Sequence, residues 1–255
     1  MKINWKLFII LWGLCLLGVL SVLPYQITLL GGLEKLTIPL YLVIVSTMVN
    51  NSILFAIIIF LGLLISDKVG LGLPILEGWL KGENVKDKFK SILPLSLGLG
   101  VLAGVLIIGF DVLFSLVGST ISLSGTTLPP AWQGLLSSLY GGINEEVLMR
   151  LFVMSLLVYI TFKIRKTEDG SPTRLGVWIS IILAALLFGV GHLPTVMALG
   201  SVTTLLVARI IILNSIGGII FGWLYWKKGL ESAMVSHFSA DLILHVLLPL
   251  LAMGI

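Results

Sequence analysis

Long apolar runs dominate this sequence and decide its fold class. A helix needs about 20 predominantly apolar residues to cross a bilayer, and short polar or basic connections separate runs of that length throughout the chain. Only 11% of the residues are charged, whereas soluble domains carry about 25%, so a soluble globule is excluded. We therefore expect an all-α polytopic membrane bundle of seven or eight transmembrane helices, with residues 1–255 as a single membrane domain. The seven predicted spans cover approximately residues 7–30, 36–65, 91–117, 131–162, 175–193, 196–226 and 230–252.

Prolines and glycines predict where these spans end. Pro194 marks the end of the fifth span, and Gly217 with Gly218 predicts a break in the sixth. Residues 66–90 are rich in glycine and charge, which breaks any continuous helix there. The first run has no small-residue cleavage pattern at its end, so we expect a retained helix rather than a signal peptide.

The distribution of Lys and Arg predicts the orientation. The amino terminus carries two, residues 66–90 five, residues 163–174 four and residues 227–228 two, so 13 of the 16 basic residues lie on one side of the predicted spans. Only Lys35 lies on the opposite side. Because cytoplasmic loops are enriched in basic residues, we expect an integral protein of the cell membrane with a cytoplasmic amino terminus. Topology thereby explains the net charge of +4, and nucleic-acid binding is not indicated.

The fourth span carries two adjacent carboxylates and an arginine. An ionisable side chain at the centre of a spanning helix costs about 2.5 to 3.5 kcal/mol on insertion scales, so each needs a reason. Glu146 and Arg150 stand at i and i+4, the spacing that lets a carboxylate and a guanidinium meet on one helix face. Glu145 projects about 100° away from Glu146, which leaves it free to take and return a proton. The alternative is a buried pair that locks two helices together, with Glu145 facing a wet cavity.

All three histidines lie in the last three predicted spans, and two of them have a partner at i and i+4. His192 follows Phe188 at this spacing, and Asp241 follows His237, where its carboxylate can orient the imidazole or line the same cavity. His245 continues that stripe one turn further. Any one of these histidines alone could equally be an interhelical hydrogen-bonding group.

Together, these polar groups suit water activation. His192, His237 and Glu145 come from three different spans, and two histidines with a glutamate can bind a catalytic zinc that keeps an open water position. The same side chains can act without metal, with Glu145 as the base and the histidines as proton donors or oxyanion stabilisers. The sequence leaves both forms open.

Three short motifs resemble one family of membrane enzymes. The strings EEVLMR (145–150), FGVGH (188–192) and HFSAD (237–241) are similar, in this order, to the EExxxR, FxxxH and HxxxN/D motifs of the CPBP family. This family contains the CAAX-processing and bacteriocin-processing intramembrane endopeptidases and is also called the Abi family. Each motif lies on a predicted spanning helix. The resemblance covers residues 130–245, which we expect to be the catalytic core.

The resemblance implies a role for each motif residue and a class of substrate. The substrate would be a membrane-associated peptide or protein, and family members are linked to bacteriocin maturation and immunity. Prenyl-protein members often carry Asn where this chain has Asp241, so a prenylated substrate is not implied, and His245 lies outside the pattern. By resemblance, the attacking water is activated by Glu145, with support from Glu146, Arg150 and Phe188, and the site is completed by His192, His237 and Asp241.

Two other functions fit the same polar residues. A proton- or ion-coupled transporter would use them as a relay, although the paired repeats of many transporters are not found here. A non-catalytic bacteriocin-immunity protein would have kept only the fold. The predicted depths also need an explanation: at about 1.5 Å per residue, Glu145 and His192 lie about 25 Å from the cytoplasmic ends of their helices, but His237 lies only about 10 Å from its own. Helix tilt, a late start of the fourth and fifth helices or a broken sixth segment would reconcile these depths.

Overall fold

Every element that the structure describes is helical. The computed structural model describes residues 3–119, 129–199 and 202–254. Four short segments depart from α-helical geometry: the 3₁₀ turn η1 (Leu33–Lys35) and the π-helical segments η2 (Gly141–Glu145), η3 (Val147–Met154) and η4 (Leu242–Leu247). The α-helices are α1 (Trp5–Leu29), α2 (Leu40–Lys68), α3 (Pro74–Leu80), α4 (Lys86–Leu116), α5 (Ala131–Tyr140), α6 (Ser155–Ile164), α7 (Arg174–Gly191), α8 (Leu193–Leu199), α9 (Thr204–Lys228), α10 (Leu230–Asp241) and α11 (Leu248–Gly254).

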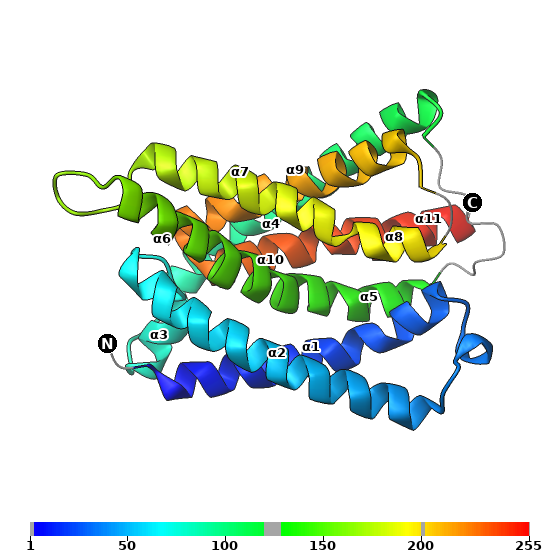
Figure 1. Cartoon of the computed structure of the whole chain (residues 1–255), viewed down its shortest axis with the longest axis horizontal. Helices are drawn as coiled ribbons and strands as arrows, with labels where there is room; N and C mark the ends of the chain where they lie inside the picture. The colour runs from blue at the N-terminus through cyan, green and yellow to red at the C-terminus, as the bar shows by residue number, and fades with distance from the viewer. Residues whose placement is uncertain (1–2, 120–128, 200–201, 255) are drawn as a thin grey trace.

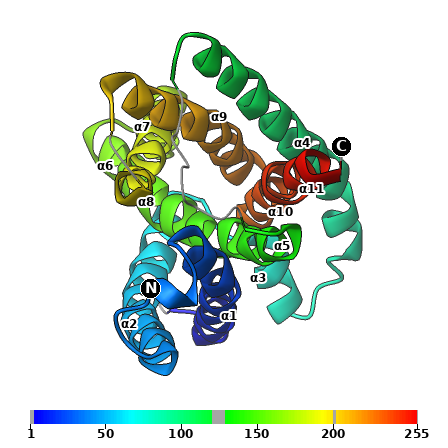
Figure 2. The ribbon, with the colours of Figure 1, turned by 90° about the vertical axis from the view of Figure 1, so that its right-hand side faces the viewer.

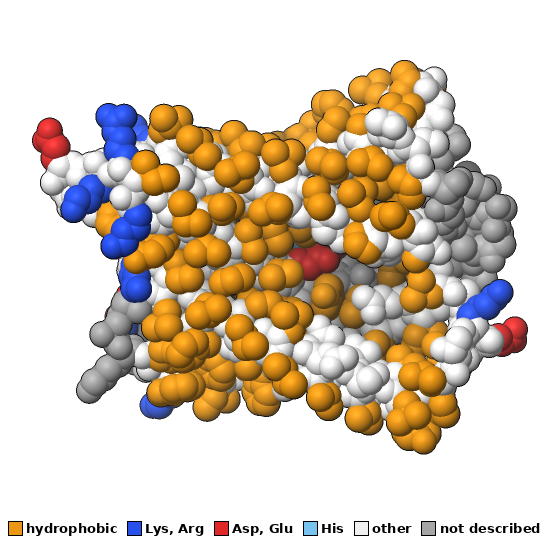
Figure 3. Space-filling view, viewed as in Figure 1, with side chains coloured by type: hydrophobic (Ala, Val, Ile, Leu, Met, Phe, Trp, Pro, Cys, Tyr) orange, Lys and Arg blue, Asp and Glu red, His pale blue; other side chains and the backbone are white. Residues whose placement is uncertain are grey.

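Seven helical stretches within the described ranges are long and apolar enough to cross a membrane. Many large apolar side chains of these helices are exposed, and they cover most of the face seen in Figure 3. Lys and Arg side chains gather at the end of the bundle where the amino terminus lies (Figures 1 and 3). The protein is therefore an integral membrane protein built as an all-α polytopic bundle, which confirms the predicted fold class.

The fourth span lies at the centre of the arrangement (Figure 2). It runs as one rod over Ala131–Ile164, in the order α5, η2, η3 and α6. On one side it contacts α1 and α2, and on the other α7 and α10, while α9 packs against α7 and α4 against α10. Because this rod touches both halves of the bundle, its polar residues can meet side chains from several other helices.

The predicted boundaries of the fifth and sixth spans were wrong. Helix α7 ends at Gly191, but α8 follows at once and extends the fifth span to Ala198, past Pro194. Pro194 is tolerated because it lies in the first turn of α8, where a backbone N–H has no helical partner. The sixth span begins at Thr204 instead of residue 196, and residues 200–201 of the prediction lie outside the described residues.

The predicted break at Gly217 and Gly218 is absent, because α9 runs through both positions. A Cβ on Gly218 would lie 2.7 Å from Cβ of Ala185 in α7. The glycine therefore lets two helices approach closely and does not interrupt the helix.

The connection between the second and third spans breaks the helix as predicted, and it contains the short helix α3. The backbone N–H of Leu230 donates to the carbonyl of Gly72 at 3.0 Å. The backbone N–H groups of Ile75 and Leu76, at the start of α3, donate to Oε1 of Glu231 at 3.0 and 2.8 Å. The segment before and within α3 therefore covers the beginning of α10.

Helices that begin at different levels explain how His237 reaches the depth of Glu145. The hairpin formed by α6 and α7 projects beyond the other helices at the amino-terminal end of the bundle (Figure 1). Helix α10 begins deeper in the bundle than this hairpin, and its first residues contact α3. Residues far along α7 therefore lie at the same depth as residues near the start of α10. Different starting levels of the helices, one of the explanations that the sequence left open, account for this.

Candidate active site

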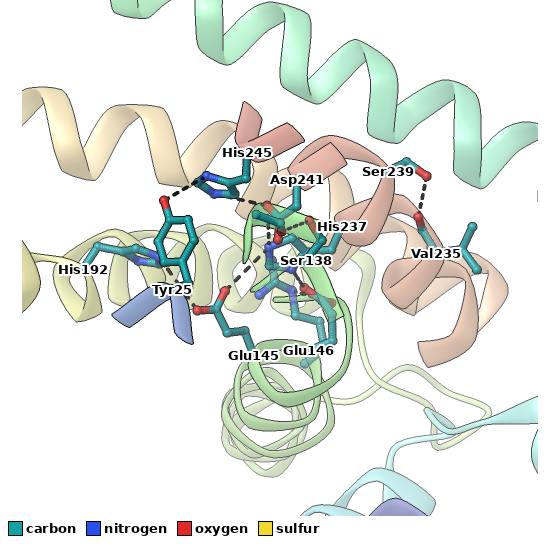
Figure 4. Close-up of polar contacts among 12 residues, drawn as sticks. Tyr25, Ser138, Glu145, Glu146, His192, Val235, His237, Ser239, Asp241 and His245 are labelled. Carbon is teal, nitrogen blue, oxygen red and sulfur yellow. Dashed lines mark hydrogen bonds and ion pairs between the residues drawn. The ribbon is translucent and has the colours of Figure 1, made fainter. Parts of the chain in front are cut away.

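The residues singled out in the sequence meet in the middle of the bundle (Figure 4). A cavity of about 370 Å³ reaches this point, with walls from α1, α5, α7, α9 and α10. Glu146 and Arg150 lie behind the cavity wall and are fully buried. The predicted residues that line the cavity are Glu145, Phe188, His192, His237 and Asp241.

Glu146 and Arg150 form the ion pair that their spacing predicts. Nε of Arg150 lies 3.3 Å from Oε2 of Glu146, and both side chains are almost completely shielded from solvent. The guanidinium lies between two rings, 5.1 Å from the centroid of Phe188 and 5.5 Å from that of Phe221. Aromatic faces stabilise a cation that has left water, so these rings help to hold the arginine beside its carboxylate.

His237 is oriented by Glu146 and by an aromatic ring. Its Nδ1 lies 2.8 Å from Oε1 of Glu146, and its ring stacks on Phe221 with centroids 4.6 Å apart. Nδ1 of His237 donates a hydrogen bond to this carboxylate oxygen, which leaves Nε2 facing the cavity. The spacing of Asp241 left two roles open, to orient this imidazole or to line the same cavity. Asp241 lines the cavity, and its Oδ1 lies 3.7 Å from Nε2 of His237.

Glu145 lies between the two histidines of the predicted site. Its Oε1 is 4.0 Å from Nε2 of His192, and its Oε2 is 3.6 Å from Nε2 of His237. Nδ1 of His192 lies 2.9 Å from the carbonyl of Phe188, which fixes that nitrogen as the donor and turns Nε2 toward the carboxylate. These separations exceed a direct hydrogen bond and are within reach of one bridging water. The Glu145 side chain keeps 24% of its exposure, so water can reach it.

Sequence reasoning missed three contributions to the site. A Cβ on Gly141 would overlap Oδ2 of Asp241, so glycine leaves room for this carboxylate. His245 places Nε2 3.9 Å from Oδ1 of Asp241, and Tyr25 lies 3.3 Å from Nδ1 of His245. The spacing of His245 from Asp241 was a usable signal, as was the Gly-Gly pair before the carboxylates. No feature of the first span pointed to Tyr25.

The residues present do not fit a three-ligand metal site. Within the described ranges, no group of three His, Cys, Asp or Glu side chains is arranged to hold a metal ion. The two oxygens of Glu145 face different histidines, at 4.0 Å from Nε2 of His192 and 3.6 Å from Nε2 of His237. The geometry therefore gives the predicted zinc form no support, and the chemistry below is derived from the side chains alone.

Comparison with known families agrees with this geometry. Residues 127–243 match the family model described as type II CAAX prenyl endopeptidase Rce1-like. This matched segment, the Rce1-like domain, is similar to that family and makes up less than half of the chain. The match confirms the resemblance to the CAAX-processing family, and the Rce1-like domain contains all three motifs, whereas Tyr25 and His245 lie outside it. No curated protein and no solved structure matches the chain.

Proposed function

We propose that this protein is an intramembrane endopeptidase that hydrolyses a peptide bond in a membrane-associated peptide or protein. Glu145 activates the attacking water, and residues 130–245 are the catalytic core of a single membrane domain. One observation carries the proposal: the Glu145 carboxylate lies between Nε2 of His192 and Nε2 of His237, at the wall of a cavity inside the membrane-spanning bundle.

The reaction begins with a water molecule held between Glu145 and His192. Glu145 removes a proton from this water as its oxygen bonds to the carbonyl carbon of the scissile peptide. The resulting oxyanion needs a hydrogen-bond donor, and an N–H at Nε2 of His237 supplies one when that ring is protonated. When the C–N bond breaks, the carboxylic acid of Glu145 returns the proton to the leaving amine. One water is consumed, a carboxylic acid and an amine are produced, and Glu145 is again a carboxylate.

Glu146 and Arg150 support this chemistry from behind the cavity. A carboxylate bonded to Nδ1 of a histidine fixes the ring and stabilises its protonated form, as in other carboxylate–histidine pairs. Arg150 keeps that carboxylate ionised in the absence of water. The pair thereby makes His237 a better donor at Nε2 without either residue touching the substrate.

The Rce1-like match favours a peptidase over a transporter. The complete set of motif residues around one cavity favours a working site over a non-catalytic immunity protein. The basic end of the bundle in Figure 3 supports a cytoplasmic amino terminus in the cell membrane, since Lys and Arg are enriched in cytoplasmic loops.

The function can be tested with two peptides of one sequence, presented to the purified protein in liposomes made up in ¹⁸O-labelled water. One peptide is farnesylated on a cysteine near its carboxyl end, and the other carries an amino-terminal acyl chain. Mass spectrometry should find a cleavage product whose new carboxyl terminus contains one ¹⁸O from solvent. A chelator of divalent metals should not change the amount of this product. Absence of cleavage in both peptides would contradict the proposal, and loss of cleavage with the chelator would reject its metal-free form.

A further inference from the structure

Two side chains outside the Rce1-like domain reach the same cavity. Tyr25 comes from α1, the first membrane span, and His245 comes from η4, two residues past the end of the family match. Both line the cavity beside Glu145 and Asp241. The hydroxyl of Tyr25 lies 3.3 Å from Nδ1 of His245, and the two rings meet edge to face with centroids 5.6 Å apart (Figure 4).

The contacts of His245 select one tautomer of its ring. A neutral imidazole carries one N–H, and its other nitrogen accepts a hydrogen bond. Oδ1 of Asp241, an acceptor, lies 3.9 Å from Nε2 of His245, whereas the hydroxyl of Tyr25 lies at Nδ1. The favoured arrangement therefore has N–H at Nε2 directed toward the carboxylate, and the O–H of Tyr25 donating to Nδ1.

Asp241 needs such a partner because the site is rich in carboxylates. Glu146 is paired with Arg150 and bonds to Nδ1 of His237. Glu145 and Asp241 then share Nε2 of His237, at 3.6 and 3.7 Å. A single nitrogen cannot satisfy two carboxylates, and their mutual repulsion would move Asp241 away unless another donor held it.

We propose that Tyr25 and His245 are positioning residues that hold the Asp241 carboxylate at Nε2 of His237. This inference rests on the proposed function, because Asp241 acts through His237, which is part of the water-activating group. In this arrangement the first helix contributes to the active site through a hydrogen bond, in addition to its packing. Neither Tyr25 nor His245 touches the reacting atoms.

Local packing supports the position of His245. A Cβ on Gly134 of α5 would overlap the carbonyl carbon and oxygen of His245, so glycine allows α5 to lie directly against η4. The π-helical winding of η4 begins immediately after Asp241. Such segments occur frequently at functional sites, because they redirect the side chains of a helix.

The first test measures kcat and KM with whichever peptide the wild-type protein cleaves. Tyr25→Phe removes the hydrogen bond to His245, and His245→Ala removes the ring that faces Asp241. Each should lower kcat by about tenfold, while KM changes little. His245→Gln, which keeps an N–H donor, should restore part of the rate. Tyr41→Phe is the matched control, because Tyr41 lies exposed on α2, and it should behave as wild type.

A double substitution tests whether the pair acts through Asp241. Asp241→Asn removes the charge that His245 is proposed to hold, so adding His245→Ala to Asp241→Asn should cause no further loss of kcat. Fully additive losses, or full activity in Tyr25→Phe and His245→Ala, would overturn the proposal. Loss of activity in Glu145→Gln together with unchanged activity in the pair variants would overturn this inference and leave the proposed function intact.

A second measurement does not depend on activity. The chain has three histidines, so ¹⁵N-histidine labelling gives three pairs of ring signals in detergent. His245 should appear as the Nε2–H tautomer, and its Nδ1 signal should shift in Tyr25→Phe but not in Tyr41→Phe. An Nδ1–H tautomer, or a Nδ1 signal insensitive to Tyr25→Phe, would reject the pair even if neither peptide were a substrate.

Discussion

Nδ1 of His237 lies 2.8 Å from Oε1 of Glu146, which links the third motif to a carboxylate of the first motif that is fully buried. Arg150 holds the other oxygen of the same carboxylate at 3.3 Å. The order arginine, glutamate and histidine thus runs from the packed interior to the cavity. Glu145 follows next to His237 and lines the cavity.

This arrangement predicts different roles for the two adjacent glutamates. Glu146→Ala and Arg150→Ala should each lower the free energy of unfolding by about 3 to 5 kcal/mol, because each leaves an unpaired buried charge. Glu145→Ala should lower it much less, since Glu145 is partly exposed. Thermal unfolding of the three variants in detergent checks this, and equal losses would remove the distinction between the glutamates.

Gly141 provides a test of how tightly the site is built. Gly141→Ala should lower the cleavage rate by about 100-fold, because its Cβ displaces the carboxylate of Asp241 and lies 3.2 Å from Nε2 of His237. Gly98→Ala on α4 is the matched control, since an added Cβ there meets open space. The two variants should differ strongly in rate while both remain folded, and similar rates would show that the site tolerates this displacement.

The predictable part of this site follows from helix geometry. The i and i+4 spacing of Glu146 and Arg150 requires a shared face whatever the surrounding fold, and the apolar runs fix the number of spans. The Glu146–His237 bond could not be predicted, because it depends on the depth at which α10 begins. The start of α10 contacts α3, a short helix within a segment that was predicted only to interrupt a continuous helix.

The predicted boundaries of the fifth and sixth spans were wrong because tertiary structure also decides where a helix ends. Pro194 and Gly218 have strong local tendencies to interrupt a helix, yet both lie where the tertiary structure accepts them. Pro194 falls in the first turn of α8, and Gly218 faces Ala185 across a close helix contact. Tyr25 was beyond prediction, because a single tyrosine in an apolar helix gives no sign of which polar residue it will meet.

The contact between Glu231 and α3 predicts a structural effect far from the cavity. Glu231→Ala should lower stability by about 1 to 3 kcal/mol, because it leaves the backbone N–H groups of Ile75 and Leu76 without their acceptor. Glu231→Gln keeps an acceptor oxygen and should lose less. Glu34→Ala, at an exposed position in η1, serves as the control in thermal unfolding. Equal stability of Glu231→Ala and wild type would show that α3 is held by other contacts.

The charge distribution predicts the orientation in the membrane. The single native cysteine, Cys15, is buried, and Cys15→Ser provides a background for new cysteines. Single cysteines at residues 81–90 and 163–174 should resist an impermeant thiol reagent added outside intact cells, whereas a cysteine at Lys35 should react. The reverse pattern would contradict the cytoplasmic position of the amino terminus.

The central claim is that Glu145 activates the water, and the most direct test is the cleavage rate of Glu145→Gln. Glutamine keeps the size of the side chain but cannot accept the proton, so the rate should fall by about 10² to 10⁴, the usual contribution of a general base, while the unfolding temperature stays near that of wild type. Glu34→Gln, prepared in parallel, should cleave the same peptide at the wild-type rate. Cleavage by Glu145→Gln at the wild-type rate would contradict the account.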